Sequence, residues 1–61
     1  METFFIEVGF TTVRPIIPDQ YRTFVVIATD RGVNDACVTA AQWVGACCAM
    51  VTSTRVVRVE I

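Results

Sequence analysis

The sequence predicts an α+β fold with the element order β-β-α-β. Residues 33–48 form the one segment with a clear helical period, and runs rich in β-branched and aromatic residues flank it on both sides. About twenty residues separate the second and third expected strands, enough for a helical crossover that leaves those two strands parallel. The first strand fits between them, antiparallel to both. We therefore expect a three-stranded mixed sheet of order 2-1-3, with the helix packed on one face, in a single domain spanning residues 1–61.

The first expected strand runs from Thr3 to Val13 and is rich in aromatic and β-branched residues. A period of two places four apolar residues on one face: Phe4, Ile6, Val8 and Phe10. The other face carries Phe5, Glu7, Gly9 and Thr11. The first face is the predicted core, and the second is predicted to be partly exposed, with Phe5 as a local apolar spot.

Residues 14–20 (RPIIPDQ) predict a loop, because each proline fixes φ and disfavours a helix in the residue before it. The Pro-x-x-Pro spacing also fits a polyproline-type ligand, but a stiff connection between strands is favoured. The second strand is expected from Tyr21 to Thr29, and its centre, residues 24–28, is apolar on both faces. This strand therefore needs cover on both sides.

The expected helix begins after the turn at residues 30–32, with Asp30 or Asn34 as the predicted N-cap. One arc of about 160° holds nine apolar residues: Val33, Ala36, Cys37, Ala40, Ala41, Trp43, Val44, Cys47 and Cys48. Most of these side chains are small, which lets a helix lie close to a sheet of larger residues. The helix is long enough to cover most of that sheet. Trp43, at the edge of the arc, either shields the core rim or reaches a neighbouring molecule.

The third expected strand spans Met50 to Ile61. A period of two separates Val57, Val59 and Ile61 from Val56, Arg58 and Glu60, and it allows Glu7 to pair with Arg58 across neighbouring strands. On the sheet face without the helix, this counting gathers Phe5, Phe24, Val26 and Val56. With Trp43 they form the predicted interface of a homodimer, joined through this face or through an edge strand.

Composition also favours association. The chain is 54% hydrophobic with a mean hydropathy of +0.57, which is more apolar material than one helix on three strands can hide. Its formal charge is −1, with five arginines, no lysine and six acidic residues, so no basic composition indicates nucleic-acid binding. An alternative, a nucleic-acid-binding dimer, requires the arginines to converge on one surface: Arg14, Arg22, Arg31, Arg55 and Arg58.

Cys37, Cys47 and Cys48 all fall within the expected helix, where their spacing prevents disulfide formation, so we interpret them as small reduced core residues. With no histidine, a zinc site would need an unusual ligand set, and no metal or cofactor is expected. The acidic residues fall at turns or stand unpaired in strands, and no glycine-rich phosphate loop is present. The sequence therefore predicts a protein that is not an enzyme.

No membrane segment or secretory signal is expected. The longest uncharged apolar run, from Trp43 to Val51, is far shorter than the ~20 residues that span a bilayer. The first ten residues contain two acids and no basic group, unlike a signal peptide. Together with reduced cysteines, this predicts a cytoplasmic location.

Several residues in the C-terminal two thirds carry a family resemblance: Ala28 and Asp30, then Ala36, Ala40 and Trp43, then Met50 to Thr54 (MVTST). In these positions the chain resembles small uncharacterised proteins encoded by actinobacterial phages. The resemblance implies a protein made in the cytoplasm of the infected bacterium and assigns no functional residue. The predicted function is a small homo-oligomeric protein-interaction module, such as a phage accessory factor that binds a host protein. The alternatives are the nucleic-acid-binding dimer and a minor structural component.

Overall fold

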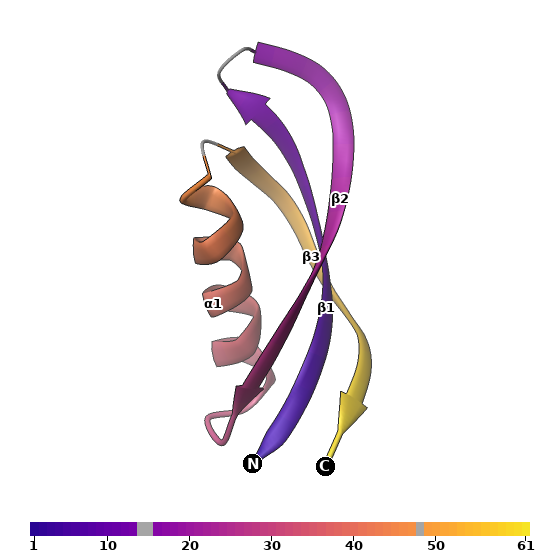
Figure 1. Ribbon diagram of the computed structural model, residues 1–61, viewed down its shortest axis with the longest axis vertical. Helices are drawn as coiled ribbons and strands as arrows, with labels where there is room; N and C mark the ends of the chain where they lie inside the picture. The colour runs from indigo at the N-terminus through magenta and orange to yellow at the C-terminus, as the bar shows by residue number, and fades with distance from the viewer. Residues whose placement is uncertain (14–15, 48) are drawn as a thin grey trace.

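The computed structural model describes residues 1–13, 16–47 and 49–61, and Figure 1 shows their arrangement. Its elements are β1 (Glu2–Val13), β2 (Ile16–Thr29), α1 (Val33–Gly45) and β3 (Ala49–Glu60). The sheet order is β2-β1-β3, and β1 runs antiparallel to both neighbours. β2 and β3 thus run in the same direction without pairing, and α1 packs on one face. The predicted α+β fold class and the strand order 2-1-3 are confirmed, but both strand pairings are antiparallel, so the sheet is antiparallel and not mixed.

Two element boundaries differ from the prediction by more than one residue. β2 begins at Ile16, so most of the predicted loop belongs to a strand, while Arg14 and Pro15 lie outside the described residues. A proline is tolerated in β2 because β2 is an edge strand, and the β1–β2 register is irregular between Phe10 and Thr12. At the other boundary, α1 ends at Gly45 instead of Cys48, which is also outside the described residues.

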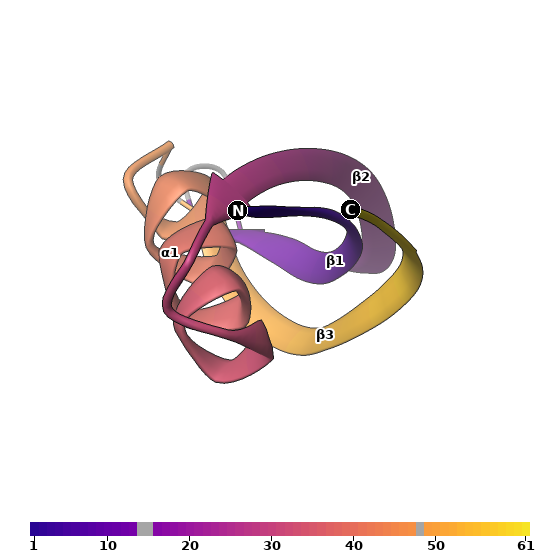
Figure 2. The ribbon, with the colours of Figure 1, turned by 90° about the horizontal axis from the view of Figure 1, so that it is seen from below.

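The strands are consequently much longer than the helix. At 1.5 Å per residue the 13-residue α1 spans about 20 Å, whereas 12 to 14 strand residues span about 40 Å or more. The expectation that the helix covers most of the sheet is therefore wrong. Figures 1 and 2 show α1 on one side of a strongly curved sheet, and Figure 1 shows the β1–β2 hairpin extending beyond the C-terminal end of α1. The Cα radius of gyration, 11.9 Å, exceeds the ~10.5 Å typical of this length.

The core lies between α1 and the central strand. Its buried members are Phe4, Ile6, Val8, Ile27, Ala36, Ala40 and Val44. Ala36 and Ala40 are fully buried, as are Ile6 and Val8 on the sheet, so the small helical side chains do allow close packing against large ones. The predicted core face of β1 is confirmed, although Val33 at the start of α1 is 45% exposed.

Two irregularities in the β1–β3 register decide which side chains of β3 face the helix. They lie between Phe5 and Ile6 and between Gly9 and Phe10. Each added residue reverses the alternation of side chains between the two faces. As a result, Val56 pairs with Ile6 and packs against the core. The prediction that Val56 lies on the uncovered face is therefore wrong, because simple counting along β3 does not include these bulges.

The same register changes the predicted ion pair. Glu7 is opposite Arg55, whose guanidinium nitrogen lies 3.3 Å from the Glu7 carboxylate, so the expected pairing of Glu7 with Arg58 is wrong. Arg58 is opposite Phe5, with its guanidinium carbon 5.4 Å from the ring centroid, and it pairs with Glu60 at 3.1 Å. The arginine side chains on both pairs are about two-thirds exposed, so each pair adds little stability.

The turn before α1 is stabilised by Thr29 rather than by a helix cap. The N-cap residue is Gly32, which has no side chain to cap with, so the predictions of Asp30 and Asn34 are wrong. The Thr29 hydroxyl accepts a hydrogen bond from the Arg31 amide at 3.0 Å and donates one to the Asp35 carboxylate at 3.5 Å. Asp35 is in the first helical turn, where its negative charge interacts favourably with the positive end of the helix dipole.

Gly32→Ala is expected to lower the free energy of unfolding by about 1–3 kcal/mol. Gly32 has φ 96° and ψ 177°, a conformation that residues with a Cβ rarely adopt. Urea unfolding followed by circular dichroism measures the change. The matched control is Gly45→Ala at the end of α1, where an added Cβ meets no atom within 4 Å. That variant should keep or slightly raise stability, and equal losses in the two would contradict the assignment.

Candidate functional site

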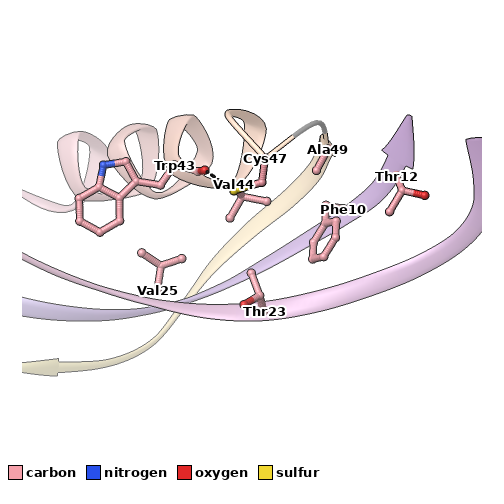
Figure 3. Close-up of a pocket in the computed structure, with 8 residues that line it drawn as sticks. All are labelled: Phe10, Thr12, Thr23, Val25, Trp43, Val44, Cys47 and Ala49. Carbon is pink, nitrogen blue, oxygen red and sulfur yellow. Dashed lines mark hydrogen bonds between the residues drawn. The ribbon is translucent and has the colours of Figure 1, made fainter. Parts of the chain in front are cut away.

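An open cavity of about 330 Å³ lies between the C-terminal half of α1 and the ends of the strands, and Figure 3 shows it. Its lining residues are Phe10, Thr12, Thr23, Val25, Trp43, Val44, Cys47 and Ala49. Most of these side chains are apolar. We refer to this cavity as the Trp43 groove.

The groove exists because the hairpin extends past the helix. Phe10 and Tyr21 pair across β1 and β2 and have ring centroids 5.8 Å apart, and Phe10 both lines the groove and packs against the core. Trp43 is 58% exposed and comes from the helix side of the groove, with Val25 on the sheet side (Figure 3). The Cys47 thiol lies 3.7 Å from the Trp43 carbonyl oxygen, to which it donates a hydrogen bond. The Trp43 side chain is therefore a large aromatic group exposed to solvent at the edge of the apolar Trp43 groove.

The sheet face opposite α1 is less apolar than predicted. Phe24 and Val26 on β2 are 66% and 52% exposed, as expected for an uncovered face. Phe5 is partly buried beneath Arg58, and Val56 lies on the other side of the sheet. Charged side chains take up much of the area that the prediction assigned to hydrophobic residues.

A second cavity, of about 350 Å³, lies on this uncovered face and is mostly polar. Its lining residues are Glu7, Gly9, Gln20, Arg22, Ser53 and Arg55, and we call it the Gly9 hollow. Gly9 on the central strand pairs with Arg22 of β2 and with Ser53 of β3. A Cβ on Gly9 would lie 2.5 Å from the Ser53 hydroxyl oxygen, so the glycine keeps the floor of the hollow open.

The arginines are distributed unequally over the molecule. Arg22, Arg55 and Arg58 share the uncovered sheet face, and within the described residues Arg22 makes no ion pair. Arg31 lies in the turn between β2 and α1, and Arg14 is outside the described residues. Three of the five arginines thus converge on one surface, despite the net charge of −1.

The cysteines are not uniformly in the core. Cys37 is half-buried and packs against the core, whereas Cys47 is exposed just after the helix, so the prediction of a core position is wrong for Cys47. Among the described residues, no three histidine, cysteine, aspartate or glutamate side chains gather to hold a metal ion. No helix in the described part of the chain is both long and apolar enough to cross a membrane.

The sequence predicted some of the exposed apolar residues but not the polar hollow. Phe24 and Val26 are exposed, as predicted for the uncovered face. Trp43 is exposed as well, where the prediction left open a place at the core rim or contact with a neighbouring molecule. The polar hollow was missed, although the alternation of Arg22 with Phe24 along one strand already put both on one face. Its other members come from β1 and β3, and only the pairing register brings them together.

Comparison of the chain with protein-family models, with curated proteins and with solved structures gives no match. The chain has two candidate functional surfaces. One is an apolar groove beside an exposed tryptophan, and the other is a polar hollow between arginines.

Proposed function

We propose that the protein is a small interaction module that pairs with a second copy of itself through the Trp43 groove. The observation that carries this proposal is the exposed indole beside an apolar cavity. Twelve large hydrophobic residues are exposed among the described residues, against seven buried core residues, so the chain alone leaves much apolar surface in water. Tryptophan in an apolar pocket is the residue type that most often dominates binding energy at protein interfaces.

A second copy suits this surface because a two-fold interface must be complementary to itself. Trp43 projects from α1 directly beside the groove, so each copy offers a bulky side chain and a cavity side by side. A cavity of about 330 Å³ has the size of a small-ligand pocket and accommodates an indole ring. In the proposed dimer, each Trp43 enters the groove of the other copy. A phage accessory factor that binds a host protein would use the same surface without self-association.

Trp43→Ala is expected to raise the dimer dissociation constant by at least about tenfold, because the anchoring side chain is lost. Sedimentation equilibrium across a range of protein concentrations measures this constant. Since Trp43 is 58% exposed, the variant should keep the circular dichroism spectrum of the parent protein.

The matched control is Val38→Ala, which removes a 55% exposed side chain of α1 that does not line the groove. Its dissociation constant should stay within about twofold of the parent value, as for surface changes outside a contact. A monomer at every concentration, or an equal effect of both substitutions, would overturn the proposed dimer.

A further inference from the structure

We propose that the uncovered sheet face binds single-stranded nucleic acid, with a backbone phosphate in the Gly9 hollow and a base stacked on Phe24. This site is on the opposite side of the sheet from the Trp43 groove, so it does not depend on the proposed dimer. Three features of this face support binding: the order of its side chains, its uncompensated positive charge and its exposed aromatic ring.

Pairing across the three strands produces an ordered array of side chains. The first row is Arg22, Gly9 and Ser53, the second is Phe24, Glu7 and Arg55, and the third is Val26, Phe5 and Arg58. Rows are about 6.7 Å apart along a strand, and neighbours within a row are about 4.8 Å apart. Three basic and two aromatic side chains therefore share one open sheet face, and side chains of these two kinds neutralise a nucleic-acid backbone and stack on its bases.

The hollow carries a local positive charge. Arg55 is paired with Glu7, but Arg22 has no acidic partner among the described residues, which leaves two guanidinium groups and one carboxylate around Gly9. Gln20 accepts a hydrogen bond from the Thr52 hydroxyl at 3.0 Å through its side-chain oxygen. The side-chain amide nitrogen of Gln20 can then donate a hydrogen bond to a ligand. An entering phosphate thus meets the Arg22 guanidinium and the Gln20 amide, with Gly9 allowing close approach.

Phe24 supplies the stacking surface. It is 66% exposed and lies on the same strand as Arg22, in the row of Glu7 and Arg55, which line the hollow. Phe5, the other aromatic residue on this face, already lies beneath the Arg58 guanidinium. Stacking on Phe24 requires a base with a free face, which single strands offer and base-paired duplexes do not. The site therefore selects single-stranded nucleic acid.

The test measures fluorescence anisotropy of a labelled single-stranded pyrimidine dodecamer titrated with the whole protein. Arg22→Gln should weaken binding by about tenfold, because the unpaired cation is lost. Phe24→Leu should weaken it by about fivefold or more, because leucine keeps apolar area but removes the π-face. The logarithm of the affinity should fall with the logarithm of salt concentration with a slope of about −2 if three arginines contact the backbone.

Two further variants separate this site from non-specific attraction. Arg31→Gln removes the same charge from the turn before α1 and should change affinity by less than about twofold. Among the described residues that line the hollow, Glu7 is the one with a carboxylate. Glu7→Gln removes this charge and frees Arg55, so it should tighten binding severalfold. If Arg22→Gln weakens binding and Glu7→Gln tightens it, the nucleic acid binds in the Gly9 hollow and is not merely attracted by the overall charge.

Four results would overturn the proposal. These are no anisotropy change at the highest protein concentration prepared, equal losses in Arg22→Gln and Arg31→Gln, equal affinity for a matched duplex, and unchanged affinity in Phe24→Leu. Inorganic phosphate serves as competitor. If phosphate displaces the oligonucleotide at low concentration and Phe24→Leu has no effect, the hollow is a simple oxyanion site without base recognition.

Discussion

Ile6→Ala is expected to leave most of the protein unfolded at 25 °C. Ile6 is fully buried at the centre of β1, where it pairs with Val25 on one side and Val56 on the other. Replacing a buried isoleucine by alanine costs about 2–5 kcal/mol, because the neighbouring atoms close the cavity only in part. A single core in a chain this short rarely contributes more than about 3–5 kcal/mol. The loss is therefore comparable to the whole stability.

Circular dichroism at fixed protein concentration, with urea unfolding of both proteins, measures this effect. The matched control is Ile61→Ala, which removes the same atoms from the fully exposed C-terminal residue. Its stability should change by less than about 0.5 kcal/mol. An Ile6→Ala variant with the parent unfolding midpoint would show that Ile6 does not sit in the core.

Ala40→Leu is expected to destabilise the protein by about 1–3 kcal/mol or more through overpacking. Ala40 is fully buried on the face of α1 that packs on the sheet, in the same cluster as Ile6 and Val8. Packing at crystal-like density leaves no space for the added atoms, so the helix must move away from the sheet. Since Val44 lies one helical turn further on and lines the Trp43 groove, self-association should weaken together with stability.

Leucine has nearly the helix propensity of alanine, so propensity alone predicts almost no change at this position. The control is Ala46→Leu, an exposed site after the helix in a right-handed helical conformation. Urea unfolding should show parent stability for this control and a lower midpoint for Ala40→Leu. Equal midpoints would mean that α1 packs on the sheet with free space at Ala40.

Local periodicity was sufficient for much of the fold. The alternation in β1 predicted that Phe4, Ile6 and Val8 are buried, and the helical period predicted that Ala36 and Ala40 face the sheet. Chain length between the second and third strands predicted the crossover and hence the order 2-1-3. These features depend on residues close together in the sequence, which is why they can be read from it.

The errors occur where an element depends on its neighbours. Val56 was placed on the wrong face because the bulge between Val56 and Arg58 in the β1–β3 pairing reverses the alternation of side chains along β3. Cys47 was placed in the core because the helical pattern continues past Gly45, where α1 ends. The prolines predicted a loop, yet an unpaired edge accommodates a residue without an amide donor.

Periodicity along the chain was enough to predict the order of the elements, the buried face of β1 and the small-residue face of α1. The extension of the hairpin beyond the helix, which opens the groove beside Trp43, became visible only in the folded chain. The pairing of both outer strands with β1 likewise places Arg22 and Ser53 on either side of Gly9. The physical reason is that periodicity records the environment of each segment separately, whereas both surfaces arise from the register and relative length of segments distant in the chain.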